Sequence, residues 1–171
     1  RKDHGLNADD IDQVIARVPP LVHHLVGRPL KEDMTPNYAR LCSAYVAARA
    51  LSHGAVDVEH FKTGAMAQPD ITALAQRVDI VIDDNPDPNA LSPLTVEIRL
   101  NNGEVHSATR EDIYGHPKNP MSKSDFLGKF RRNCAGARPA IPEAQFEALI
   151  TRIDTLDTEP DVADLVDLIT V

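Results

Sequence analysis

The sequence contains no tryptophan, and aromatic residues make up only 4% of its 171 positions. A core built from it must therefore be aliphatic, filled by valine, leucine, isoleucine and alanine. No apolar run approaches the roughly 18 residues that a membrane-spanning helix needs. There is also no hydrophobic stretch typical of a secretory signal. These absences argue against a membrane protein.

Cysteine is equally scarce, since Cys42 and Cys134 are the only two. No CxxC motif and no His/Cys ligand spacing is present, which argues against a disulfide framework and against structural zinc. A reducing cytoplasm is the expected compartment. Cys134 lies near the end of a predicted helix, where the helix dipole raises a thiol pKa. We therefore do not expect it to act as a nucleophile.

Positive charge is in deficit, because the chain carries a formal net charge of -8. A nucleic acid or an anionic membrane would require a basic face, so neither is an expected partner. A small anionic ligand remains compatible, because cations gather locally in the second half of the chain. These are Lys118, Lys123, Lys129, Arg131 and Arg132.

A glycine-rich phosphate loop is also missing. The turn-rich stretch "GHPKNP" has one glycine and two prolines, so few backbone N–H groups are free to cradle an anion. His116 and Asn119 each precede a proline, which holds both in extended conformations. The stretch is thus a rigid loop, suited either to positioning a side chain or simply to making a tight turn.

Apolar residues alternate with polar ones in three segments, which predicts strands at residues 78–84, 94–100 and 104–110. The sequence Asn-Asn-Gly at 101–103 predicts a hairpin turn between the last two. Between the first strand and this hairpin runs a proline-rich link.

Helical spacing predicts one long helix over residues 37–53, ending at Gly54, with Tyr45 and Cys42 in the core. Shorter helices are expected within 56–65 and 69–78. Ser122 and Asp125 resemble a capping box, followed by Phe126, Leu127 and Phe130 as a buried stripe. Further helices are expected from Pro142, with Phe146, Leu149, Ile150 and Ile153 on one face, and from Pro160.

Three stretches near the N-terminus are harder to interpret. "RKDHGL" is typical of a helix that closes at Gly5, which suggests part of a longer protein. Residues 7–18 have helical spacing but many β-branched residues, and the local pattern alone slightly favours a helix. Residues 19–36 contain four prolines, so an extended or looped segment is predicted. The whole pattern suits an α+β fold, an antiparallel sheet with helices packed on one side.

Candidate site residues are few. His23 and His24 are adjacent in the predicted loop, and on an extended segment only one of them would face a given cleft. Two surface histidines without a role are the plainer interpretation. Arg40 could bind a carboxylate through a two-pronged contact. From the residues alone the chain is an acidic α+β domain with a polar loop at 114–120.

Two motifs in the sequence resemble those of a known family. "YGHPKNPMSKSDFLGKF" resembles the GxPxNPxSxxxxxxKF signature of the MmgE/PrpD family, and "YARLCSAYVAARALSHGAVDVEHF" is similar to one of its helices. The segments at 11–20 and 153–169 fit in the same order, so the resemblance covers nearly the whole chain. Cys42 stands where serine is common in the family, and Ala44 where proline is common.

The resemblance implies a fold and a domain organisation. It makes residues 11–18 a strand. It also makes residues 1–138 a small α+β lid domain, with 139–171 forming C-terminal helices that would pack on a larger helical domain absent from this chain. Family members tend to form dimers, so a homodimer is expected.

The resemblance also implies an activity. Members such as 2-methylcitrate dehydratase, cis-aconitate decarboxylase and an iminodisuccinate epimerase act on small di- or tricarboxylates by proton abstraction, without cofactor or metal. His23 or His24 would be the catalytic contribution of the lid, with His116, Lys118 and Arg40 as substrate-binding residues. The fragment alone would be inactive. The alternative is a non-catalytic small-molecule-binding or interaction module of the same fold.

Overall fold

The computed structural model describes residues 4–170. They form two compact units, the first ending at Pro120 and the second starting at Met121. Gly5 has a φ of 61°, the left-handed conformation predicted for it. The helix expected before it falls on residues 1–3, outside the described residues.

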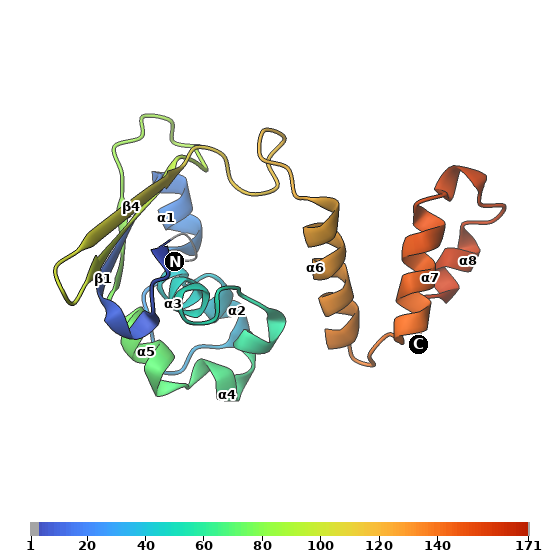
Figure 1. The fold of residues 1–171 in the computed structure, drawn as a ribbon, viewed down its shortest axis with the longest axis horizontal. Coiled ribbons are helices and arrows are strands. Elements are labelled where there is room, and N and C mark those ends of the chain that lie inside the picture. The colour runs from blue at the N-terminus through green and yellow to red at the C-terminus, as the bar shows by residue number, and fades with distance from the viewer. Residues whose placement is uncertain (1–3, 171) are drawn as a thin grey trace. The chain divides into compact units, whose positions relative to one another are not determined.

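A four-stranded sheet organises the N-terminal unit (Figure 1). Its strands are β1 (Ile11–Val18), β2 (Val78–Ile82), β3 (Leu94–Leu100) and β4 (Val105–Arg110), in the order β2-β1-β3-β4. The predicted α+β class is confirmed. The sheet is mixed rather than purely antiparallel, because β1 and β2 run parallel. The helical crossover between them makes a parallel pairing possible.

Residues 11–18 form a strand, as the resemblance implied and against the local helical pattern. Val14 is buried and lies opposite Val78 of β2 and Ile98 of β3, while Arg17 is exposed. Tertiary pairing on both sides outweighs the weak helical spacing of an eight-residue segment. A short 3-10 turn, η2 (Ala8–Asp10), leads into the strand.

Helices cover one face of the sheet (Figure 1). The principal ones are α3 (Ser43–His53) and α5 (Pro69–Ala75), and between them lie the short turns η3 (Val58–Phe61) and α4 (Thr63–Met66). The aliphatic core predicted from the composition is present. It includes Ile11, Val14, Ala48, Ile71, Leu74, Val78 and Ile98.

Two expectations about the helices were wrong. The segment 19–36, predicted to be extended or looped, is helical over α1 (Pro20–Val26) and free of helix or strand over 28–35. Pro20 takes the first position of α1, where a missing N–H is harmless. The long helix is broken into α2 (Pro36–Arg40) and α3. Cys42 is extended at the break, with φ -101° and ψ 92°, and forms an isolated β-bridge with Gly27. Gly54 ends α3 in the left-handed conformation.

The C-terminal unit is helical. It contains α6 (Lys123–Gly136), α7 (Glu143–Ile153), the 3-10 turn η4 (Leu156–Thr158) and α8 (Ala163–Asp167). Ser122 caps α6 as predicted, its Oγ accepting the Asp125 N–H at 3.1 Å. The prediction that Phe126, Leu127 and Phe130 form a buried stripe was partly wrong, because the Phe126 side chain is 59% exposed.

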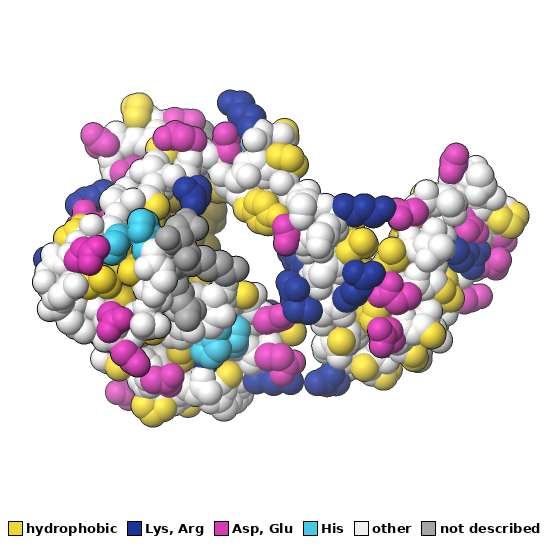
Figure 2. All heavy atoms as spheres, in the orientation of Figure 1, with side chains coloured by type: hydrophobic (Ala, Val, Ile, Leu, Met, Phe, Trp, Pro, Cys, Tyr) yellow, Lys and Arg dark blue, Asp and Glu magenta, His cyan; other side chains and the backbone are white. Residues whose placement is uncertain are grey.

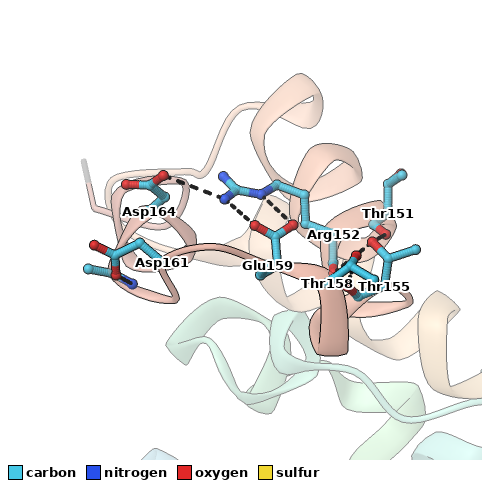
Figure 3. Close-up of polar contacts among 8 residues, drawn as sticks. Thr151, Arg152, Thr155, Thr158, Glu159, Asp161 and Asp164 are labelled. Carbon is cyan, nitrogen blue, oxygen red and sulfur yellow. Dashed lines mark hydrogen bonds and ion pairs between the residues drawn. The ribbon is translucent and has the colours of Figure 1, made fainter.

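Ion pairs join the elements of this unit. Arg131 of α6 donates two hydrogen bonds to the Glu147 carboxylate on α7. Arg152 likewise donates two hydrogen bonds to the Glu159 carboxylate, from Nε at 3.0 Å and from Nη2 at 2.5 Å (Figure 3). Its Nη2 also lies 3.7 Å from a carboxylate oxygen of Asp164. These hydrogen bonds hold the pKa of Glu159 and of Glu147 below the ordinary range of a glutamate.

Much apolar surface of the C-terminal unit is left open (Figure 2). A groove of about 200 Å³ lies between α6 and α7, lined mainly by apolar side chains, with Lys123 and Asp154 also in its wall. The unit's largest exposed hydrophobic residues are Phe126, Ile153, Leu156, Val162, Val166 and Ile169. Among residues 4–170, no helix combines the length and the hydrophobicity that crossing a bilayer takes.

Candidate functional site

His23 and His24 lie in the last turn of α1 rather than in a loop. Adjacent helical residues point about 100° apart, so the two rings still have different surroundings. His23 is half-buried against Gly27, where an added Cβ would meet the His23 ring at 3.0 Å and its carbonyl oxygen at 2.5 Å. His24 is exposed. Of the pair, His24 is therefore the one accessible to a ligand.

The end of α1 is tied to the core. The Ser43 hydroxyl donates to the carbonyl oxygen of Val26 at 2.8 Å, and the Gly27–Cys42 bridge lies beside it. Cys42 is completely buried, so this anchor is fixed to the interior. The turn that carries the histidines is thereby held in one place, as a positioned side chain requires.

Arg40 is exposed at the end of α2. Its guanidinium lies 5.5 Å from the centre of the Phe61 ring and donates to the Asn37 side-chain oxygen at 3.2 Å. Within residues 4–170 it forms no ion pair with a carboxylate. Its charge is therefore accessible to an anionic ligand, and its role as a substrate-binding residue stays a prediction.

The loop at 115–119 is closed by its own hydrogen bonds. The Gly115 N–H donates to the Asn119 carbonyl, and the Asn119 N–H to the His116 carbonyl, both at 2.8 Å. Asn119 also donates through its side chain to the Asp112 carbonyl at 3.0 Å. Gly115 has a φ of 98°, a conformation that favours glycine. This network makes Asn119 an architectural residue.

The ring of His116 is engaged within the same loop. Its Nδ1 lies 3.2 Å from the Lys118 N–H and 3.2 Å from a carboxylate oxygen of Asp112. A neutral ring accepts from the first, and a protonated ring pairs with the second. Lys118 is exposed, and its ammonium has no ion-pair partner in the described part of the chain. Between these two, Lys118 is the freer to meet a ligand.

All five predicted site residues belong to the N-terminal unit, but they sit on three separate segments. His23 and His24 are on α1, Arg40 is on α2, and His116 and Lys118 are in the loop after β4. Across residues 4–170, no hydrogen bond or ion pair connects a predicted site residue on one of these segments to one on another segment, and the Lys118 N–H bond to His116 stays within the loop. The structure thus places the residues without assembling them into a catalytic constellation.

A buried polar cluster escaped the sequence analysis. Arg49 of α3 is only 1% exposed. Its Nε donates to the Tyr45 hydroxyl at 2.9 Å, Nη1 donates to the Gln68 side chain at 2.6 Å, and Nη2 donates to the Ala65 carbonyl. The Tyr45 hydroxyl in turn donates a hydrogen bond to the His60 carbonyl. Arg49 thereby holds η3 and α4 against α3, and among the described residues no carboxylate balances its charge.

His60 lies at the edge of this cluster, in surroundings that disfavour its protonation. Its Nδ1 accepts the Asp57 N–H at 3.0 Å, so a proton at that nitrogen would break the cap of η3. Burial, followed by the charges of Arg49 and His53, lowers the pKa of His60 below its ordinary value. Asp57 and Glu59 act in the opposite direction and more weakly.

Acid should therefore loosen this region. A histidine with a lowered folded pKa stabilises the fold fully above its unfolded pKa near 6.5, and that contribution is lost as the pH falls. We expect the stability advantage of wild type over a His60→Gln variant to shrink between pH 7 and pH 5, measured by urea unfolding. His24→Gln, which removes an exposed histidine outside this cluster, is the control. An advantage of His60 that grew on acidification would contradict the expectation.

Neither thiol is activated. Cys42 and Cys134 are buried, and burial raises the pKa of both thiols above the ordinary value. For Cys134 this agrees with the predicted inertness, although the cause is burial rather than the helix dipole. No three His, Cys, Asp or Glu side chains of residues 4–170 cluster closely enough to hold a metal ion. The metal-free reaction implied by the resemblance remains a prediction.

The comparison with protein families decides what this fold is. The MmgE/PrpD C-terminal domain matches residues 1–155. The chain belongs to the MmgE/PrpD family. The family expected from the two sequence motifs is thus confirmed.

Two curated relatives align with almost all of this MmgE/PrpD domain. It is 28% identical over 163 residues to the cis-aconitate decarboxylase of Mus musculus, covering 95% of this chain and 32% of that protein. It is 26% identical over 166 residues to the cis-aconitate decarboxylase of Homo sapiens, covering 96% of this chain and 33% of the relative. The chain spans about a third of the length of these relatives.

Proposed function

We propose that this domain is the lid of a cofactor-independent lyase that acts on a small di- or tricarboxylate. The observation that carries the proposal is the match of nearly the whole chain to two cis-aconitate decarboxylases, within a family assignment over residues 1–155. Decarboxylation of a tricarboxylate is the first candidate reaction, and dehydration of 2-methylcitrate is the second. Both pass through a carbanion-like centre next to a carboxylate.

Such a reaction needs a proton carrier and positive charge beside the carboxylates. In this proposal His24, exposed on the fixed end of α1, carries the proton. Arg40 and Lys118, whose charges no carboxylate neutralises in the described residues, hold the substrate. His23 supports the turn by packing on Gly27. The remaining catalytic groups come from the part of the protein beyond this chain, and the lid excludes water when it closes over the substrate.

The C-terminal unit has a different part in the proposal. Its groove between α6 and α7 and its open apolar side chains form a surface that a larger helical domain of the same protein would cover. A homodimer is proposed as the working assembly, and light scattering on the full-length protein tests it.

The decisive experiment is turnover by the full-length protein. Cis-aconitate and 2-methylcitrate are supplied separately, and products are followed by NMR. We expect turnover of at least one, none by the 171-residue chain alone, and a kcat lowered about 10²- to 10⁴-fold by His24→Gln. His53→Gln, on α3, is the matched control and should retain activity. A full-length protein that binds these acids without converting them would instead support the non-catalytic module.

A further inference from the structure

Tyr38 gathers two cations on its ring. The Arg28 guanidinium carbon lies 5.4 Å from the ring centre, and the Lys31 ammonium nitrogen lies 4.7 Å from it. Both distances are within the range of cation–π attraction. The ring itself is fixed, because the Tyr38 hydroxyl donates to the Pro29 carbonyl at 2.8 Å and Thr35 caps the helix that carries it.

Neither cation has an acidic partner. Within residues 4–170, Arg28 and Lys31 form no ion pair, and this includes Glu32 and Asp33, which follow Lys31 directly in the sequence. Other basic side chains do pair with carboxylates: Lys62 with Glu59, Arg99 with Asp12, Lys123 with Asp154, Arg131 with Glu147 and Arg152 with Glu159. Other described cations, such as Arg40 and Lys118, also lack an ion pair, but Arg28 and Lys31 lie together on one aromatic ring.

Like charges held close together repel each other, and a bound anion would relieve that repulsion. Arg28 adds a fork of N–H donors that matches a carboxylate, and Lys31 adds a compact charge. A local arrangement that opposes stability is typical of a functional site. An anionic ligand would therefore suit this pair of cations.

The backbone that carries Arg28 is anchored and borders a groove. Arg28 directly follows Gly27, whose bridge to buried Cys42 anchors this segment, and the Arg28 N–H donates to the Leu41 carbonyl at 3.4 Å. Arg28 also borders a groove of about 270 Å³ lined in part by Pro29, Leu30 and Gln76. The one acid in that groove, Asp79, accepts a hydrogen bond from Gln13 at 2.7 Å.

We propose that Arg28 and Lys31, held on Tyr38, form a carboxylate-binding subsite for the substrate. This rests on the proposed function and deepens it. Arg28 is four positions beyond His24, so the subsite adjoins the end of α1 that carries the proposed proton carrier. A tricarboxylate keeps carboxylates away from its reacting carbon, and the subsite binds one of these. An acidic segment of a protein is the other possible source of the same chemistry, and the experiment separates the two.

The test uses the full-length protein and the variants Arg28→Gln and Lys31→Gln. Each should raise KM for the converted tricarboxylate about 10- to 100-fold, with kcat within about threefold, because ground state and transition state lose the same contact. Arg28→Lys should restore part of the affinity. Arg17→Gln, an exposed cation on β1, is the matched control and should leave KM unchanged.

Binding of propane-1,2,3-tricarboxylate, which resembles the substrate but does not react, keeps this test independent of turnover. Loss of its binding in the Arg28 and Lys31 variants, by calorimetry, supports the subsite even if the wild type converts no acid. Unchanged KM and unchanged binding overturn it. Variants that alter only self-association, with substrate affinity intact, also overturn it and identify an acidic protein segment as the ligand.

Discussion

Replacing Arg49 with alanine should lower the free energy of unfolding of the N-terminal unit by about 3 kcal/mol. The substitution removes three hydrogen bonds and leaves the Ala65 carbonyl and the Gln68 side chain without their donor. A buried acceptor left unsatisfied costs about 1–3 kcal/mol. The loss is moderated because a buried cation without a carboxylate is itself unfavourable.

Urea unfolding of the 171-residue chain measures this effect. Arg49→Met fills most of the volume and should cost less than Arg49→Ala, because only the hydrogen bonds are lost. Arg40→Ala removes an exposed arginine from the preceding helix and should stay within about 0.5 kcal/mol of wild type. A loss below about 1 kcal/mol for Arg49→Ala would show that the cluster is not a structural tie.

Hydrogen exchange then identifies which elements Arg49 holds. The guanidinium contacts α4 through Ala65 and η3 through Tyr45, so the amides of residues 57–66 should exchange faster in the variant. Those of β1, with which Arg49 forms none of its three hydrogen bonds, should change only as far as global stability does. Uniform acceleration across the unit would mean that the cluster supports the whole core instead.

Elements with a strong repeating pattern could be predicted from the sequence. Strands β3 and β4, their Asn-Asn-Gly turn and the helices α5 and α7 follow directly from alternation, helical spacing and turn residues. The α+β class follows as well. In each of these elements the local preference and the tertiary environment agree, which is the condition under which pattern analysis works.

The elements that were mispredicted depend on distant contacts. The break between α2 and α3 exists because Cys42 pairs with Gly27, which lies 15 positions earlier. The parallel pairing of β1 with β2 spans the helical crossover. The four prolines of residues 19–36 suggested an extended or looped segment, although Pro20 suits the first position of a helix equally well. No window of a few residues contains this information.

The candidate site shows the same division. Residue types indicated His23, His24 and Arg40, but their exposure depends on α1 and α2 as folded. Arg49 could not be found, because in an alanine-rich helix a single arginine looks like an ordinary surface residue. The pairing of Arg28 and Lys31 on Tyr38 is likewise visible only in three dimensions, since the three residues lie on two segments.

The Phe146→Ala variant should unfold the C-terminal unit and leave the N-terminal one intact. Phe146 is 6% exposed in the core of this unit, and truncating a buried phenylalanine costs about 3–5 kcal/mol. A unit of this length has a total stability of only a few kcal/mol. The amides of α7 should therefore exchange almost as in an unfolded chain, while those of β1 and α5 remain protected.

This variant also tests where the two units divide. The structure groups α6 with α7, through the Arg131–Glu147 pair and a hydrogen bond from the Ile141 N–H to the Cys134 carbonyl at 3.2 Å. Protection of α6 should therefore disappear together with that of α7. Phe126→Ala, at a 59% exposed position of α6, is the matched control and should leave both helices protected. If α6 stayed protected in Phe146→Ala, the boundary would lie near residue 138, where the family resemblance placed it.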